Sequence, residues 1–257
     1  MISICLVSHN SRAELELLLP SVNNALKGLS SEILLVDNCC SDQTTPFIEK
    51  NYPDVKIIGN LKPAGYGANQ NRNIDRAKGT YLAIINPDII VPFHLFHTML
   101  HFMGEHSDAA MSTCRVCNRD GTSQYLNKRD PALFDLFIRR FLPQRYRGRF
   151  QDRLYKYEMR DVGYEKVIDV PFISGCFMFA RADVIRNVGG FDDRFFMYFE
   201  DADLCRRVRQ EGSRILYCPD VSIIHRWERA AHSSLKWSAV FALSALKYYH
   251  KWGFKLL

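Results

Sequence analysis

The stretch Leu82-Ala83-Ile84-Ile85-Asn86-Pro87-Asp88 joins a continuous apolar run to a polar turn. An uninterrupted apolar run of this kind is typical of a strand that is buried on both faces, as in a parallel sheet covered by helices. Pro87 restricts Asn86 to an extended conformation and ends the strand. The sequence therefore predicts a buried strand over residues 81–86, whose carboxyl end presents Asn86 and Asp88.

Strand and helix patterns alternate on both sides of this stretch. Apolar runs predict further strands, and apolar residues at helical spacing predict the helices between them. The expected strands are residues 2–7, 32–37, 55–59 and 109–116, and the expected helices are residues 13–26, 44–51, 68–78 and 95–105. This alternation predicts an α/β fold with right-handed crossovers, in which helices flank a mainly parallel sheet.

The alternation breaks over residues 120–166, a segment rich in Arg, Tyr and Phe. We interpret this segment as an insertion over one face of the sheet, because it is too aromatic for a flexible linker. Regular structure is expected to resume with a strand over 167–179, a helix from Ala182, a helix over 200–210 and a short strand over 214–218. Residues 1–232 are thus expected to form one domain, followed by an amphipathic basic and aromatic helix over 233–257.

The composition excludes intrinsic disorder, because 47% of the 257 residues are hydrophobic and can fill a sizeable core. The net charge of +6 suits an anionic partner, such as a nucleotide, a lipid phosphate or an anionic membrane surface. The first residues lack the features of a signal peptide. The apolar stretch over 238–246 is much shorter than the roughly 20 residues that a membrane span needs.

Eight cysteines in a chain without a predicted signal peptide are expected to be reduced thiols in the cytoplasm. Cys114 and Cys117 form a lone Cys-x-x-Cys pair. A zinc site needs a second pair or histidines at matching spacing, and none is evident in the sequence. We interpret the pair as two small residues on a strand.

Polar segments are expected to meet at one edge of the sheet. In open α/β sheets, ligands bind beyond the carboxyl ends of the strands. The segments at such positions are Ser8-His9-Asn10, Asp37-Asn38, Gly65-Tyr66-Gly67 and Asn86-Pro87-Asp88. Their shared edge predicts a ligand site.

Each residue of this edge also has a purely structural interpretation. Asp37 could bind a base or ribose, or it could cap an Asx-turn. Gly65 could let the backbone approach a ligand, or it could serve an ordinary turn. Arg72, in the following helix, could contact phosphate or point into solvent. Asp88 could supply oxygen to a hard divalent cation, or it could be a turn residue that follows a proline.

A second acidic cluster begins the helix predicted over 200–210. Glu200, Asp201 and Asp203 lie in its first turn, where the helix dipole stabilises ionised carboxylates. The helix dipole alone is enough to explain acids at these positions, without any catalytic role. The apolar run over 195–199, however, places these acids in a partly buried setting, where Asp201 or Glu200 could accept a proton from a reacting hydroxyl. His225 ends another apolar run and is either a structural residue or a ligand.

In their order and spacing, these motifs resemble glycosyltransferase family 2, in its rhamnosyltransferase-like branch. The resemblance runs from about residue 2 to residue 227 and weakens in the 120–166 insertion. The matching segments are residues 7–10, 36–42, 65–71, 82–88, 174–178, 189–192, 196–205 and His225.

The resemblance implies a GT-A-type, Rossmann-like fold, a nucleotide-diphosphate sugar donor, a divalent cation (Mg²⁺ or Mn²⁺) and inversion at the anomeric carbon. Asn86-Pro87-Asp88 takes the place of the family's Asp-x-Asp motif, with Asp88 on the metal and Asn86 in place of the first acid. Asp201 matches the catalytic base, and His225 matches a position that ligates metal in some relatives. The nucleotide-sugar site is expected to comprise Ser8, Asn10, Asp37, Asn38, Gly65, Arg72 and Asn86.

The branch favours dTDP-rhamnose as donor and a lipid-linked bacterial surface glycan as acceptor. The expected location is the cytoplasm, with the C-terminal helix at the inner face of the membrane and no nucleic-acid partner. Two other classes compete with this hypothesis. One is a nucleotidyltransferase or nucleotide-sugar epimerase on a related α/β scaffold, and an epimerase needs an early Gly-x-Gly-x-x-Gly motif, which the first strand lacks. A non-enzymatic sugar-binding or lipid-binding module does not need Asp88 and Asp201 at one cleft.

Overall fold

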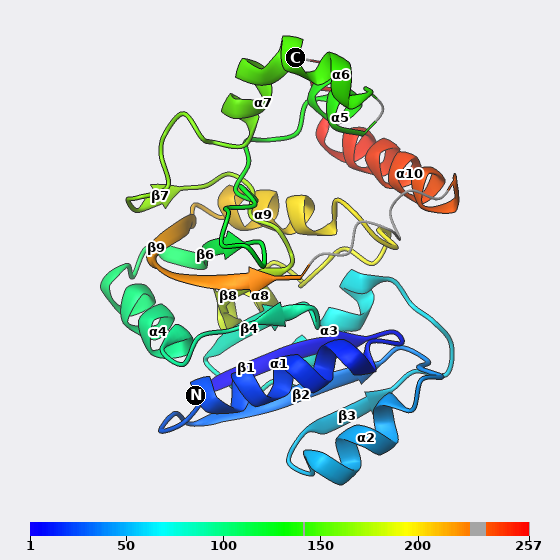
Figure 1. Ribbon diagram of the computed structural model, residues 1–257, viewed down its shortest axis with the longest axis vertical. Coiled ribbons are helices and arrows are strands. Elements are labelled where there is room, and N and C mark those ends of the chain that lie inside the picture. Colours follow the sequence, from blue (N-terminus) through cyan, green and yellow to red (C-terminus); the bar gives the residue numbers. More distant parts are fainter. Residues whose placement is uncertain (141, 227–234, 257) are drawn as a thin grey trace.

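The computed structural model describes residues 1–140, 142–226 and 235–256 (Figure 1). The first half alternates between strand and helix, as the sequence predicts. In chain order its elements are β1 (Ile2–Ser8), α1 (Arg12–Ala25), β2 (Ser31–Asp37), α2 (Thr44–Asn51), β3 (Lys56–Gly59), α3 (Tyr66–Arg76), β4 (Tyr81–Ile85), β5 (Ile89–Ile90), α4 (Leu95–Glu105) and β6 (Ala109–Cys117).

The second half begins with the helices of the insertion. These are α5 (Leu133–Arg140), α6 (Gln144–Arg147), the 3₁₀ turn η1 (Gly148–Phe150) and α7 (Gln151–Tyr157). The chain then returns through β7 (Ile168–Asp169), β8 (Phe177–Arg181), α8 (Ala182–Asn187), α9 (Glu200–Gln210), β9 (Arg214–His225) and α10 (Leu235–Trp252).

The strands form one sheet in the order β3-β2-β1-β4-β8-β6-β9-β5, and β7 pairs with β9. Strands β1 to β4 pair in parallel, which confirms the prediction for this half. Strand β8 runs antiparallel to both of its neighbours, β4 and β6. The sheet is therefore mixed rather than mainly parallel. The sequence pattern did not reveal the antiparallel direction of β8, because the chain enters this strand from a long insertion instead of a helical crossover.

Helices cover both faces of the sheet, which explains the continuous apolar runs. On β1, Ile4 and Leu6 belong to the core under α1 and α4. Cys5 points the other way, into the core that also holds Ile74 of α3 and Leu204 of α9. Because successive side chains on a strand face opposite sides, burial on both sides requires apolar residues at every position.

Two predicted strands have different limits in the structure. The strand expected over 167–179 is split into β7 and β8, and the loop between them carries Ser174 and Gly175. The strand expected over 214–218 continues to His225 as β9. Its pairing with β6 shifts register between Cys218 and Ser222. Pro219 lies in this bulge, where its missing N–H removes no ladder hydrogen bond.

The insertion packs on the C-terminal helix as well as on the sheet. Helices α5 to α7 lie beside α10, at the opposite end of the molecule from α2 and β3 (Figure 1). The Tyr249 hydroxyl of α10 donates to the Pro131 carbonyl at 3.0 Å. Towards the end of the insertion, Tyr164 packs edge-on against Tyr217 of β9, with ring centroids 5.1 Å apart. The prediction that the insertion covers one face of the sheet therefore holds only for the end of the insertion, around Tyr164.

A buried carboxylate joins α10 to α9. Asp203 is fully buried. It accepts hydrogen bonds from Arg207 Nε at 2.8 Å, Trp252 Nε1 at 2.9 Å and Lys251 Nζ at 2.6 Å. Since Lys251 and Trp252 belong to α10, this ion-pair network fixes the C-terminal helix on the helix that begins at Glu200.

Replacing Asp203 by Asn should lower the free energy of unfolding by about 3 kcal/mol, because breaking a buried ion pair leaves uncompensated charge. Urea unfolding followed by circular dichroism measures this change. Asp54→Asn is the matched control, because Asp54 is exposed between α2 and β3. Equal unfolding free energies for the two variants would contradict the assigned role of Asp203.

Candidate active site

A strained turn presents two carboxylates at the start of α9. Tyr198 and Phe199 both have positive φ angles, 70° and 69°. Each costs on the order of 1–3 kcal/mol, so packing must hold the turn in place. The Phe199 ring is buried between Phe241 and Tyr248 of α10, with each centroid at 5.3 Å. The aromatic face of α10 thus stabilises the turn that sets the direction of the following acids.

These acids border a cavity of about 450 Å³. The volume lies in the range of small-molecule sites. Its walls come from the end of β4, the insertion, the loop before β8, the start of α9, the end of β9 and α10. The polar and charged side chains that line it are Tyr66, Asn86, Asp88, Lys128, Arg139, Arg140, Tyr157, Ser174, Tyr198, Glu200, Asp201 and His225.

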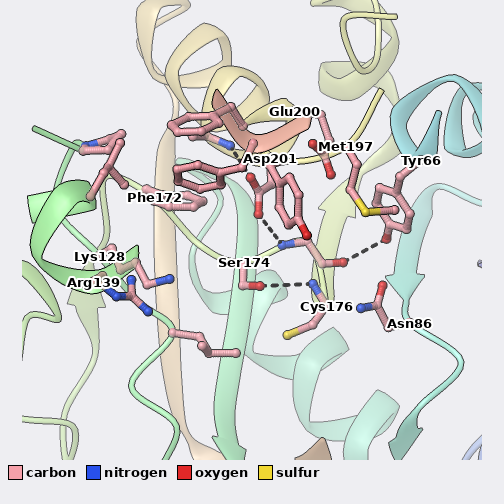
Figure 2. Close-up of a pocket in the computed structure, with 18 of the residues that line it drawn as sticks. Tyr66, Asn86, Lys128, Arg139, Phe172, Ser174, Cys176, Met197, Glu200 and Asp201 are labelled. Atoms are coloured by element: carbon pink, nitrogen blue, oxygen red, sulfur yellow. Dashed lines mark hydrogen bonds between the residues drawn. The ribbon is translucent and has the colours of Figure 1, made fainter. Parts of the chain in front are cut away.

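Asp201 is held by the loop before β8. Its Oδ2 accepts a hydrogen bond from the Gly175 N–H at 3.1 Å. The Gly175 carbonyl in turn accepts from the Tyr66 hydroxyl at 3.0 Å. These bonds, drawn in Figure 2, link Asp201 through Gly175 to Tyr66 and fix the carboxylate at the wall of the cavity. The sequence includes Gly175 only as part of the matching segment 174–178 and predicts no role for it.

Burial raises the pKa of Asp201, while the Gly175 N–H and the charge of Lys128 oppose the rise. Burial, with the charge of Asp201 beside it, raises the pKa of Glu200 well above its ordinary value. Glu200 Oε2 is buried and has no hydrogen-bond partner among the described residues. The Gly175 N–H and Lys128 thus favour the ionised form of Asp201, whereas the surroundings of Glu200 favour its protonated form. This difference in surroundings favours Asp201 as the proton acceptor, and the role of either acid stays a prediction.

Asp88 and His225 lie together on another wall of the cavity. Pairing of β5 with β9 sets Ile89 opposite His225, which brings Asp88 Oδ2 within 3.2 Å of His225 Nε2. The second carboxylate oxygen, Asp88 Oδ1, is buried and lacks a hydrogen-bond partner in the described part of the chain. An oxygen in this state is suited to a cation.

Gln124, from the insertion, orients the His225 ring. Its Nε2 donates to the His225 carbonyl at 2.8 Å and to Asn118 Oδ1 at 2.9 Å, which fixes the amide. Its Oε1 then faces His225 Nδ1 at 2.9 Å and accepts that proton. With Nδ1 engaged by Gln124, Nε2 is the ring nitrogen that faces Asp88, and metal-ligating histidines are commonly oriented in this way by a partner on their other nitrogen.

Asp88 and His225 therefore fit a divalent cation. No group of three or more His, Cys, Asp and Glu residues suited to a metal occurs among the described residues. A cation here would complete its coordination with phosphate oxygens and water, as Mg²⁺ commonly does. Asn86 also lines the cavity, and its backbone N–H donates a hydrogen bond to the Cys176 carbonyl at 2.9 Å.

Three predicted nucleotide-binding residues meet at the carboxyl ends of β1 and β2. Register pairs Ser8 with Asp37, and the Asn38 N–H donates to the Ser8 carbonyl at 2.8 Å. The Asp37 carboxylate accepts from the Cys40 N–H at 2.7 Å and the Thr45 hydroxyl at 2.5 Å. This is the local capping that the sequence left as an alternative. The cluster does not line the cavity, and its binding of a nucleotide stays a prediction.

Three further predicted residues have partners within the protein. Asn10 Oδ1 accepts from the Ser41 N–H at 2.7 Å. A Cβ at Gly65 would lie 2.6 Å from the Phe196 carbonyl oxygen, so glycine is required for packing against the loop before α9. Arg72 is half-buried, and its guanidinium donates to the Gly59 carbonyl at 3.0 Å. Neither Gly65 nor Arg72 lines the cavity, so the structure brings neither beside Asp88.

The sequence assigns no role to Gln124, which orients His225, or to the cavity residues Lys128, Arg139 and Arg140 of the insertion. No motif or spacing identifies them, because the segment lacks clear periodicity. The available signal was its composition, in which arginines alternate with aromatic residues.

The family model described as "Glycosyltransferase like family 2" matches residues 7–243. The chain belongs to this family. This confirms the resemblance drawn from the motifs, and the fold is the predicted GT-A type.

Curated relatives of this glycosyltransferase include two rhamnosyltransferases. N-acetylglucosaminyl-diphospho-decaprenol L-rhamnosyltransferase of Mycobacterium tuberculosis is 26% identical over 254 residues, which cover 91% of this chain and 78% of the relative. Rhamnosyltransferase WbbL of Escherichia coli is 29% identical over 170 residues, which cover 63% of this chain and 60% of the relative.

Solved structures share the fold at low identity. S. aureus TarS 1-349 in complex with UDP is 16% identical, with a TM-score of 0.61, and the match covers 96% of this chain and 65% of TarS 1-349. Mannosyltransferase PcManGT from Pyrobaculum calidifontis, in complex with GDP-Man and Mn²⁺, is 14% identical, with a TM-score of 0.65. The match covers 97% of this chain and 63% of PcManGT. This chain thus spans about two thirds of each.

Asp88→Ala should weaken binding of dTDP at least about tenfold in Mn²⁺ and hardly at all in EDTA, because the carboxylate acts through the cation. Isothermal titration under both conditions measures this difference. Asp75→Ala is the matched control, since Asp75 is exposed on α3. If dTDP binding is the same with and without Mn²⁺ in the unmodified chain, the metal assignment is wrong.

Proposed function

We propose that this family 2 enzyme is an inverting glycosyltransferase that moves rhamnose from dTDP-rhamnose to a hydroxyl of a lipid-linked glycan. The observation that carries the proposal is the placement of Asp201. This acid is partly exposed to a cavity whose other walls hold Asp88 and His225. A proton acceptor and a candidate cation site thus face one space of substrate size.

The reaction needs a single displacement. Asp201 accepts the proton of the acceptor hydroxyl while the hydroxyl oxygen bonds to the anomeric carbon of the donor. The bond from that carbon to the diphosphate breaks, and its electron pair leaves with the nucleotide diphosphate. Because attack is opposite to the leaving group, the configuration inverts without a protein nucleophile. The raised pKa of Glu200 favours its neutral form, in which it adds no second negative charge beside the base.

A divalent cation held by Asp88 and His225 would neutralise the charge that develops on the leaving diphosphate. Asn86, at the end of β4, lies on the same cavity and is suited to contact ribose or phosphate. The remaining nucleotide contacts in this proposal come from Ser8, Asn10, Asp37 and Asn38, with Arg72 and Gly65 as predicted from the sequence.

The choice of donor and acceptor rests on the relatives. Both curated relatives described above are named rhamnosyltransferases, and the name of the mycobacterial protein specifies a diphospho-decaprenol acceptor. Identities of 26% and 29% support a shared substrate class for this chain. The glycan itself is proposed only as a bacterial surface polysaccharide.

A lipid-linked acceptor requires access to a membrane surface. No described helix is long and apolar enough to cross a bilayer. Helix α10 nevertheless exposes Leu243 and Leu246 while its aromatic face packs inward. Lys251 pairs with Asp192, so it contributes less to lipid attraction than the sequence suggested, whereas Lys247 donates to the neutral Arg194 carbonyl and keeps its charge. We propose peripheral attachment through the apolar edge of α10, at the inner face of the cytoplasmic membrane.

Asp201→Asn should lower kcat at least about a hundredfold and leave donor binding nearly unchanged, because loss of a general base affects the chemical step. Purified variants are compared by turnover of dTDP-rhamnose with a lipid-diphosphate sugar acceptor and by dTDP titration. Glu211→Gln, at the exposed end of α9, is the matched control. Near-normal turnover in Asp201→Asn, with loss in Glu200→Gln, would move the base to Glu200.

The double variant Leu243→Ser/Leu246→Ser should co-sediment with anionic vesicles less than the unmodified chain at low salt, because it removes apolar area from the proposed contact. Leu61→Ser is the matched control, since Leu61 is fully exposed on the loop before α3. If all three proteins remain equally soluble in the presence of vesicles, α10 does not attach this enzyme to membranes.

A further inference from the structure

Three cations of the insertion line the cavity without carboxylate partners. Lys128, Arg139 and Arg140 all belong to its wall. None of them takes part in an ion pair among the described residues, whereas two neighbours do. Arg129 pairs with Asp161 at 2.8 Å, and Arg153 pairs with Asp135 at 2.5 Å. Within the described part of the chain, carboxylates therefore neutralise these two arginines, which do not line the cavity, but none of the three cations that line it.

The protein partners of these three groups are neutral. The Lys128 ammonium lies over the Phe172 ring, 5.5 Å from its centroid. Arg139 lies over the Tyr157 ring at 5.5 Å. Arg140 donates to the Ser238 hydroxyl of α10 at 2.9 Å. Aromatic rings and a hydroxyl orient cations but do not cancel their charge.

This concentration of charge is costly in the empty cavity. Burial, and next the neighbouring charge of Arg139, lower the pKa of Lys128 to about 7. Figure 2 shows Lys128 and Arg139 side by side, with their charged ends in the pocket. A bound anion of two or more charges would offset this repulsion and restore the full charge of Lys128.

The position of the cluster indicates which anion it serves. In Figure 2, Lys128 and Arg139 lie on one side of the pocket, Tyr66 and Asn86 lie on the other, and Asp201 lies between them. The donor diphosphate is assigned to the side of Asn86 and Asp88. The cations therefore lie on the side from which an acceptor hydroxyl would approach Asp201.

We propose that Lys128, Arg139 and Arg140 bind the diphosphate of a lipid-diphosphate sugar acceptor. The inference rests on the proposed function and deepens it. The acceptor sugar would lie between the cations and Asp201, so its hydroxyl reaches the base while its diphosphate reaches the insertion. Leu136 of α5 and Phe241 of α10 line the same cavity and offer an apolar path for the first part of the lipid.

In this proposal, the insertion and α10 together form the binding site for the acceptor diphosphate. The planar guanidinium of Arg139 is suited to paired hydrogen bonds with phosphate oxygens. Arg140 is oriented through Ser238, so α10 positions a cation as well as the turn before Glu200. The cluster would select acceptors that carry a diphosphate over neutral glycosides of the same sugar.

The first test measures binding without catalysis. Inorganic pyrophosphate is titrated into the full chain in EDTA, and dTDP is titrated in Mn²⁺. Arg139→Gln and Lys128→Met should each weaken pyrophosphate binding about tenfold, the scale of one charge-assisted hydrogen bond, and leave dTDP binding unchanged. Arg145→Gln is the matched control, because Arg145 is exposed in the same insertion and lies over Tyr146.

The second test measures discrimination between acceptors. The unmodified chain should prefer N-acetylglucosaminyl-diphospho-decanol to decyl N-acetylglucosaminide in kcat/KM, and Arg139→Gln should lose about tenfold of that preference, with Arg139→Lys between them. Unchanged preference in a folded Arg139→Gln variant would overturn the proposal. A loss of dTDP binding equal to the loss of pyrophosphate binding would also overturn it, because the cations would then serve the donor.

Failure of the proposed function has a different signature. It would appear as no turnover of any nucleotide sugar by the unmodified chain. Failure of the acceptor site would appear in an active enzyme, as equal discrimination by the unmodified chain and by Arg139→Gln.

Discussion

The site depends on the packing of Phe199 against α10. Two consecutive residues, Tyr198 and Phe199, adopt positive φ angles that side chains disfavour, and aromatic contacts with Phe241 and Tyr248 hold them there. The next two residues in the chain are Glu200 and Asp201. A C-terminal helix that the sequence places outside the main domain is therefore part of the framework of the candidate active site. The Asp203 network with Lys251 and Trp252 secures the same contact from the other side of the turn.

The first half of the fold could be predicted because its strands are buried on both faces. Continuous apolar runs identify such strands, and the polar residues that end them identify the ligand edge. Asp88 was located in this way, since Pro87 ends the strand immediately before it. His225 could be placed at the end of an apolar run. Its contact with Asp88 depends on β5 pairing with β9, which the sequence does not reveal.

The second half of the fold and the rest of the candidate site depend on tertiary contacts that no periodic pattern in the sequence reveals. The strand expected over 167–179 is interrupted by the loop that carries Gly175, and the hydrogen bond from its N–H to Asp201 forms only in the folded chain. The roles of Gln124, Lys128 and Arg139 likewise follow from the path of the insertion. At Gly65 the sequence left a ligand contact and an ordinary turn as alternatives, and it could not reveal that the Phe196 backbone leaves no room for a Cβ there.

The central claim is a single displacement in which Asp201 takes the acceptor proton and no protein group bonds to the sugar. The most direct measurement is proton NMR of the reaction with whichever nucleotide sugar the enzyme turns over, comparing the anomeric configuration of the donor with that of the first product formed. This account predicts inversion, so a β-linked donor gives an α-linked product. Retention of configuration would contradict it, because retention requires a route other than one displacement opposite the leaving diphosphate.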